Sequence, residues 1–224
     1  MHSRAVVVLA AVLLAGGSFA GSGATPASAA SKVSARWLLA QIPAAYEAGW
    51  STYNRALFAY PADLNGDCQN TRAEVLISES IVPVTYTSAS HCYVKTGRWY
   101  SFYDGVWGRS ASSFQLDHLV PLYEAWISGA RLWTAADRRR YANDTAYGPT
   151  LVMVTSRVNQ AKSGDDPASW LPPRVAARCT YAIRWVEVKY RWRLKMDSAE
   201  RAVLSRLLLG TCGATLVTLP PRGR

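Results

Sequence analysis

The chain carries two kinds of apolar periodicity, and each predicts a different kind of element. Apolar residues recur every three to four positions in several segments, which is the spacing of one helix face. These predicted helices cover residues 35–47, 71–80, 122–132, 134–141, 178–189 and 198–209. Thr71 and Thr134 begin two of them, each with an acidic residue three positions on, as in a capping box. Pro43 is expected to interrupt the first segment or to begin a second helix, and Gly210 to close the last.

Short runs rich in β-branched and aromatic residues lie between these helices and predict strands. They cover residues 82–86, 92–94, 99–103, 113–116 and 151–155. Asp104-Gly105 is a tight-turn signal after the third run, and residues 155–162 predict a turn or a short helix that ends at Gly164. The pattern favours an α+β fold, and neither an internal repeat nor a long linker divides it.

The N-terminal segment has the features of an export signal. Arg4 precedes a short apolar run, and Ala27-Ser28-Ala29 is a cleavage motif, so residues 1–30 are predicted to be a signal peptide. The run is shorter than the roughly 20 apolar residues that span a bilayer, although an uncleaved N-terminal anchor is the alternative. Residues 31–219 are expected to form one domain and residues 220–224 a disordered tail. We therefore expect a secreted, extracellular monomer with no membrane association after cleavage.

The charge balance narrows the class of partner. Lys and Arg total 25 against 15 Asp and Glu, which gives a formal net charge of +10. A chain this basic is attracted to polyanions such as nucleic acid, cell-wall polymers or anionic membrane surfaces. Charge alone does not choose among them, because many exported proteins are basic only for solubility.

Four cysteines follow the predicted signal peptide: Cys68, Cys92, Cys179 and Cys212. An even number in an exported chain predicts two disulfides, for which three pairings exist. We favour Cys68–Cys92 and Cys179–Cys212, because each pair lies toward one end of the chain. No C-x-x-C spacing occurs, which argues against a structural zinc site built on cysteine.

The segment from Leu116 onward holds the candidate chemistry. A predicted strand leads into Asp117-His118, and Asn159 follows a later strand. A carboxylate is a hard oxygen ligand suited to Mg²⁺ or Mn²⁺, and an amide oxygen adds a neutral ligand. The histidine, with an ordinary pKa of about 6.5, suits general-base work. Taken alone, however, an Asp-His pair is more often a hydrogen-bonded strand terminus.

Further sequence elements after this Asp-His pair make the pattern more specific. The stretch from Leu116 to Leu122, the pair Asn143-Asp144, the N-x-x-K element from Asn159 to Lys162, and the segment from Asp166 to Pro173 occur in this order. Together they resemble the secreted bacterial HNH endonucleases, which are related to the C-terminal nuclease domain of GmrSD-type restriction endonucleases (DUF1524-like). The resemblance extends from about residue 53 to residue 212. It implies a ββα-metal core embedded in helices with two disulfides, and hydrolysis of phosphodiester bonds in DNA or possibly RNA.

The resemblance also implies roles for single residues. His118 corresponds to the general base, Asp117 to its adjacent metal ligand, and Asn159 to the later ligand of one divalent ion, with Mg²⁺ expected and Mn²⁺ or another divalent ion as alternatives. Asn143 corresponds to the catalytic-site Asn that braces the loop and orients the base. Lys162 is then a catalytic-site lysine and a phosphate contact. Gln160 stands where relatives often have a basic residue, which removes one possible phosphate contact.

Other functions remain open at this stage. Arg139 and Arg140 are candidate substrate-binding residues, although a basic run on a short helix is more often a solvated face. One rival is a catalytically silent secreted protein whose basic surface binds nucleic acid or cell wall. The other is a different hydrolase that pairs His118 with a serine, but no G-x-S-x-G element supports it.

Overall fold

The computed structural model describes residues 31–224, so the predicted signal peptide lies outside the described residues. The helices are α1 (Ala35–Gln41), α2 (Thr71–Glu79), α3 (Leu122–Ile127), α4 (Ala135–Ala142), α5 (Ser156–Lys162), α6 (Arg178–Trp192), α7 (Ser198–Leu207) and α8 (Gly210–Ala214). The strands are β1 (Lys32–Ser34), β2 (Thr85–Tyr86), β3 (Val94–Ser101), β4 (Val106–Ser110), β5 (Phe114–His118), β6 (Leu151–Thr155) and β7 (Leu216–Thr218). The expectation of a mixed helix and sheet fold is confirmed.

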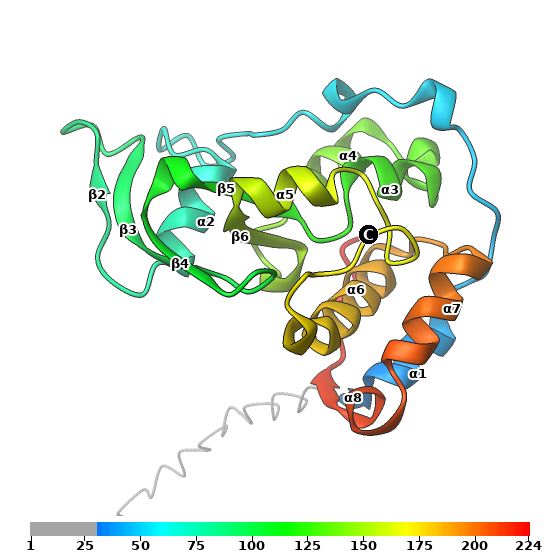
Figure 1. The fold of residues 1–224 in the computed structure, drawn as a ribbon. Coiled ribbons are helices and arrows are strands. Elements are labelled where there is room, and N and C mark those ends of the chain that lie inside the picture. The colour runs from blue at the N-terminus through cyan, green and yellow to red at the C-terminus, as the bar shows by residue number, and fades with distance from the viewer. Residues whose placement is uncertain (1–30) are drawn as a thin grey trace, which may run out of the picture.

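The strands form three small antiparallel sheets. β2, β3 and β4 form one sheet in that order, β1 pairs with β7, and β5 pairs with β6. In Figure 1, α2 lies beside the β2–β3–β4 sheet and the β5–β6 pair, while α1, α6, α7 and α8 gather on the other side of the molecule. Two sets of buried apolar residues follow this division, a larger one among the helices and a smaller one between α2 and the strands.

The pair β5–β6 carries the candidate site. Its register joins Phe114 to Thr155 at one end and His118 to Leu151 at the other. α5 begins directly after β6, because the Thr155 side chain accepts a hydrogen bond from the Val158 backbone and caps the helix. The local order is therefore strand, strand, helix, with His118 as the last residue of the first strand.

Several predicted elements occur with small shifts. The strand at 151–155 has the expected bounds, and α4 is capped by Thr134, whose side chain accepts from the Asp137 backbone. α2 is capped by Asn70 and not by Thr71, since the Asn70 side chain accepts from the Ala73 backbone. The hydroxyl of Thr71 instead contacts Asn143, as described below.

α1 ends at Gln41, two residues before Pro43, so the expected interruption at this proline is confirmed, and no second helix begins there. Two other boundary predictions are wrong. The two strands expected around Gly97 form the single strand β3, in which Gly97 leaves room for neighbouring side chains: a Cβ there would lie 2.6 Å from Trp99 and Ser80 atoms. Gly210 has a φ of +58° and begins a further helix, α8, separated by two residues from the end of α7, instead of closing the helical region.

Both disulfides join the favoured partners, Cys68 with Cys92 and Cys179 with Cys212. The C-terminal residues, expected to be disordered, make contacts that tie them to α6. Pro220 is buried, and the Gly223 backbone donates to the carbonyl of Arg191. Among residues 31–224, no helix has the length and apolar content needed to cross a membrane.

Candidate functional site

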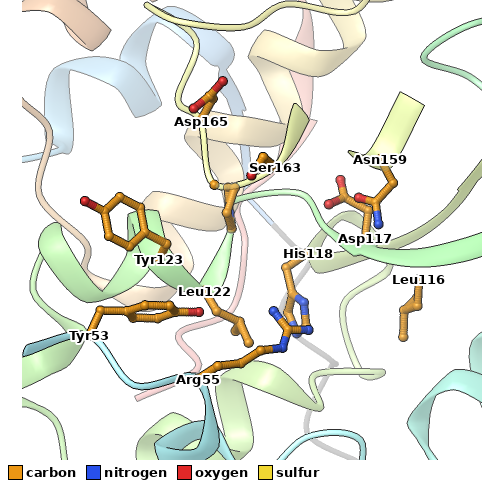
Figure 2. A pocket seen from close by; sticks show the side chains of 12 residues that line it. Tyr53, Arg55, Leu116, Asp117, His118, Leu122, Tyr123, Asn159, Ser163 and Asp165 are labelled. Carbon is orange, nitrogen blue, oxygen red and sulfur yellow. The ribbon is translucent and has the colours of Figure 1, made fainter. Parts of the chain in front are cut away.

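A pocket of about 560 Å³ opens beside the end of β5, the beginning of α3 and the end of α5. It brings together Asp117, His118 and Asn159, three of the residues singled out in the sequence (Figure 2). The full lining is Tyr53, Arg55, Leu116, Asp117, His118, Pro121, Leu122, Tyr123, Asn159, Ser163, Gly164 and Asp165. Asn143 and Lys162 lie outside this lining, so the predicted set divides into residues that face the pocket and residues behind it.

His118 is held in one orientation by its surroundings. Its Nε2 lies 2.9 Å from the carbonyl oxygen of Ala142, and Tyr60 packs edge-on with ring centroids 4.7 Å apart. A carbonyl oxygen only accepts, so Nε2 carries the proton and Nδ1 keeps a lone pair. Burial lowers the pKa of His118 to about 3, against the opposing hydrogen bond to Ala142, and the charges of Arg55 and Lys162 lower it further. The imidazole is therefore held in its neutral form, with Nδ1 as the unprotonated nitrogen.

Asp117 lies at the pocket wall and also faces the protein interior. One carboxylate oxygen accepts from Lys162 Nζ at 2.8 Å, and the other accepts from the Tyr103 hydroxyl at 2.6 Å. Burial raises the pKa of Asp117, and the nearby Lys162 ammonium opposes that shift. A carboxylate has about four lone-pair positions, so two of them remain for another ligand.

Lys162 is completely buried, with a relative exposure of 0%. Besides Asp117, its ammonium donates to the backbone carbonyl of His118 at 2.9 Å. Burial lowers its pKa, and Asp117 opposes the change. In this arrangement the ammonium does not reach the pocket, so the predicted phosphate contact has no support from the geometry. Lys162 instead positions the end of β5.

Asn159 projects from α5 beside the Asp117 carboxylate (Figure 2). Its Nδ2 donates to Gln115 Oε1 at 2.9 Å, and Gln115 lies on the neighbouring strand β5. In this arrangement the amide nitrogen is used by Gln115, and the amide oxygen is left as a neutral ligand near Asp117.

Asn143 lies behind the pocket and joins three segments of the chain through its side-chain amide. Its Oδ1 accepts from the Ala62 backbone at 2.9 Å and from the Thr71 hydroxyl at 2.6 Å. Its Nδ2 lies 2.8 Å from the carbonyl of Arg139 on α4. Because Ala142, whose carbonyl orients His118, is the preceding residue, Asn143 anchors the segment that holds the imidazole.

The predicted substrate-binding arginines do not line the pocket. Arg139 and Arg140 are exposed on α4, and Arg140 pairs with Asp137 one turn earlier. A cation that does line the pocket is Arg55, which the sequence reading missed. Its guanidinium lies 5.7 Å from the centroid of Tyr60, the ring that packs on His118. No local motif marks Arg55, since only packing of the 55–58 turn against α4 brings it there.

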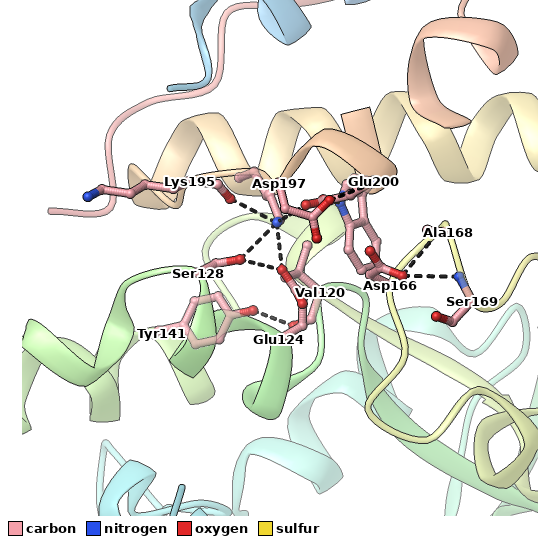
Figure 3. A network of polar contacts seen from close by, with 12 residues as sticks. Val120, Glu124, Ser128, Tyr141, Asp166, Ala168, Ser169, Lys195, Asp197 and Glu200 are labelled. Atoms are coloured by element: carbon pink, nitrogen blue, oxygen red, sulfur yellow. Dashed lines mark hydrogen bonds and ion pairs between the residues drawn. The ribbon is translucent and has the colours of Figure 1, made fainter. Parts of the chain in front are cut away.

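Glu124 lies on α3 but does not line the pocket. It is 1% exposed and accepts a hydrogen bond from Lys189 Nζ at 2.6 Å. The same ammonium donates to Glu200 at 2.6 Å, so it joins α3, α6 and α7 (Figure 3). We call Lys189, Glu124 and Glu200 the helix-core charge cluster.

A group of three carboxylates also lies near that cluster. Glu47, Asp166 and Asp197 have oxygens within 4.8 Å of one another. Burial, followed by the charge of Glu124 and a hydrogen bond with Asp197, raises the pKa of Glu47 to about 8. This group does not include Asp117 or His118, and within residues 31–224 no group of three or more His, Cys, Asp or Glu ligands forms around that pair.

Comparison with known proteins shows to which family the chain belongs. Residues 70–207 match the family model of GmrSD restriction endonucleases, C-terminal domain. An uncharacterized secreted protein of Arthroderma benhamiae (strain ATCC MYA-4681 / CBS 112371) is 37% identical over 188 residues, which cover 84% of this chain and 89% of that protein. No solved structure matches the chain. The family model spans more than half of the sequence and includes every pocket residue from Leu116 to Asp165, and on this evidence the chain belongs to the family of GmrSD restriction endonuclease C-terminal domains.

Proposed function

We propose that this protein is a secreted, metal-dependent endonuclease that hydrolyses phosphodiester bonds in the pocket around His118. Membership of the GmrSD C-terminal family supports a nuclease-related function, and the similarity to a secreted protein supports export. The observation that carries the proposal is the tautomer of His118, because the Ala142 contact leaves Nδ1 as a base inside a polar pocket. The strand–strand–helix order of β5, β6 and α5 is the arrangement expected of a ββα-metal core.

The residues around Asp117 fit a divalent cation. Asp117 retains lone pairs beyond those used by Lys162 and Tyr103, and the Asn159 amide oxygen lies beside it. Oxygen donors of this kind suit Mg²⁺, with Mn²⁺ or another divalent ion as alternatives. When bound, such an ion supplies positive charge that stabilises the developing negative charge on phosphate oxygens.

Groups of the protein itself have the other roles in the proposed reaction, which are proton transfer, phosphate binding and positioning. His118 takes a proton from the attacking water through Nδ1, while the Ala142 carbonyl stabilises the imidazolium through Nε2. Arg55 lines the same pocket and offers a planar guanidinium that pairs with phosphate oxygens. Lys162 and Asn143 keep the strand end and the Ala142 segment in place. Arg55 thus takes over the phosphate contact first expected of Lys162.

The test is nicking of a supercoiled plasmid by wild type and His118→Asn protein in a panel of divalent ions. Loss of a general base reduces the rate by about 10²–10⁴-fold. The matched control is His91→Asn, because His91 is exposed, packs on Tyr86 and lies outside the pocket. Wild-type nicking by His118→Asn would overturn the proposed base.

Removal of divalent ions is the second arm of that experiment. Chelation with EDTA is expected to abolish nicking, and re-addition of Mg²⁺ or Mn²⁺ to restore it, since the phosphate charge is then stabilised again. Cleavage that persists in chelator would contradict the metal-dependent reaction. Salt-sensitive binding of DNA without any nicking would favour the silent binding protein.

A further inference from the structure

The pocket continues past His118 and ends at two aromatic side chains that the proposed hydrolysis does not use. Tyr53 and Tyr123 line this end, whereas Asp117 and Asn159 line the other, and Arg55 lies between them (Figure 2). The two tyrosine rings meet edge to face with centroids 5.2 Å apart. Both side chains are half-buried, so each is anchored in the protein and still reaches the pocket.

The anchoring of both rings is extensive. Tyr53 also packs against Trp126 and Phe58, at centroid distances of 6.2 and 6.5 Å. Tyr123 is covered on another side by the loop after α5, where a Cβ on Gly164 would lie 3.2 Å from the Tyr123 ring. A ring fixed in this way loses little conformational entropy when a flat ligand packs on it.

The neighbouring charge identifies the chemistry of that ligand. Arg55 lines the pocket with both His118 and Tyr53, and its side chain reaches toward His118 (Figure 2). A cation for phosphate beside aromatic rings is the combination that proteins use for unpaired nucleotides, with the backbone on the cation and the base on a ring.

We propose that Tyr53 and Tyr123 form a nucleobase subsite that holds an unpaired base next to the phosphate bound at Arg55. This inference rests on the proposed nuclease function and deepens it. A base stacked on a pocket tyrosine has left its own duplex stack, so the subsite favours single-stranded or locally opened nucleic acid over intact duplex.

The test measures binding to protein that carries His118→Asn, so that the probe is not cleaved. The probes are a fluorescent single-stranded dT oligonucleotide, the same length of abasic oligonucleotide, and a duplex of that length, at one low salt concentration. Tyr123→Leu keeps apolar bulk but removes the aromatic face, and is expected to weaken dT binding roughly 5- to 150-fold. Tyr123→Phe is expected to bind as the parent does, and the abasic probe to bind all variants equally.

A matched control and a second variant guard against misfolding. Tyr100→Leu removes a half-buried tyrosine that pairs with Trp107 at 4.8 Å, away from the pocket, and is expected to leave dT binding unchanged. Tyr53→Leu is expected to weaken dT binding in the same direction as Tyr123→Leu. Thermal unfolding of each variant confirms that the proteins compared are folded.

The outcomes separate this inference from the nuclease proposal. The subsite is overturned if both tyrosine variants bind dT as tightly as the parent does. It is also overturned if their affinity for the abasic probe falls by the same factor as their affinity for dT. In either case the nuclease proposal stands as long as wild type nicks plasmid. If dT binding depends on the tyrosines but wild type never nicks, the subsite stands and the nuclease is overturned. If wild type neither binds nor cleaves nucleic acid, both are overturned.

Discussion

Two buried lysines in this protein have opposite electrostatic settings. Lys162 and Lys189 are both 0% exposed. Lys162 is hydrogen-bonded to one carboxylate, Asp117, with a smaller attraction from Asp165, and burial outweighs both, so its pKa is lowered. Burial also disfavours charge on Lys189, but Glu124 and Glu200 outweigh it, and the net effect is a raised pKa. The number of carboxylates hydrogen-bonded to each ammonium, one against two, therefore sets the direction, since both lysines are equally buried.

This difference distinguishes the helix-core charge cluster, which joins helices, from the Lys162–Asp117 pair, which belongs to the candidate site. The helix-core charge cluster joins three helices, and its ammonium also donates to Ser128 and to the Lys195 carbonyl, so every proton is used within the core. The Lys162–Asp117 pair borders the pocket, and Asp117 keeps acceptor capacity on that side. A buried charge pair by itself thus says little about function, whereas one that borders a polar pocket marks the candidate site.

The strongest way to sharpen this comparison is Lys189→Met. The change leaves two buried carboxylates without their shared cation, which is expected to cost about 3–5 kcal/mol of the free energy of unfolding. For a domain of this size that lowers Tm by roughly 6–20 °C. Calorimetry checks the shift.

The control for that change replaces the acids as well. Lys189→Met combined with Glu124→Gln and Glu200→Gln removes the unpaired charges, so part of the lost Tm is expected to return. A single variant as stable as wild type would show that the cluster does not hold the helices.

Lys162→Met is expected to affect activity more than stability. Only one carboxylate loses its partner, so Tm falls less than in Lys189→Met, but the His118 carbonyl also loses its donor. A displacement of the base by about 1 Å costs roughly 10²-fold in rate. Plasmid nicking at a temperature where both proteins are folded measures this. Unchanged nicking would assign the pair to the core, like that of Lys189.

The smallest expected effect concerns pH and Glu47, next to the helix-core charge cluster. Glu124, Asp197 and Asp166 all face Glu47, and its folded-state pKa of about 8 exceeds the ordinary value of 4.5. The protonated form is therefore favoured in the folded state, so this stabilisation is complete below about pH 4.5 and is lost as pH rises toward about 8. Tm is expected to fall over this range in wild type.

Glu47→Gln removes one of the groups that titrate in this range and is expected to reduce the slope of Tm against pH, while Glu79 and Glu200, whose pKa values are raised to about 7 and about 8, keep part of it. Asp67→Asn serves as the control, because Asp67 lies on an exposed turn, and it is expected to keep the wild-type slope. Equal slopes in wild type and Glu47→Gln would assign the pH dependence to other groups.

Much of the local structure was accessible from sequence. β6 and α4 follow directly from an apolar run and from the Thr134 cap, because these signals act within a few residues. The interruption of the first helix before Pro43 was also accessible, because a proline disfavours helical backbone at the residue that precedes it. The continuous β3 was missed because Gly97 is a packing requirement there rather than a turn.

The residues of the candidate site also fall into two groups, those that the sequence pointed to and those that only the structure brought into view. Asp117, His118 and Asn159 were found because an ordered motif carries them along one stretch of chain. Tyr53 and Arg55 were missed as site residues, since they reach the pocket only through packing of a distant segment. Tyr123 directly follows the motif on α3, and nothing in the sequence distinguishes a tyrosine that lines a pocket from one packed in the core. The phosphate contact expected of Lys162 lacked support for a related reason. The sequence shows that the residue is charged, but it does not show that the side chain is buried and paired with Asp117.

The sequence by itself determined the α+β class, the disulfide partners favoured among three pairings, and the residues at the end of β5 and in α5, because local periodicity and motif order encode them. The tertiary structure decided which of these groups face the pocket, which tautomer His118 adopts and which cation can meet a phosphate. These properties depend on burial and on partners from remote segments, such as Ala142 for the imidazole, and only folding brings those partners within hydrogen-bonding distance.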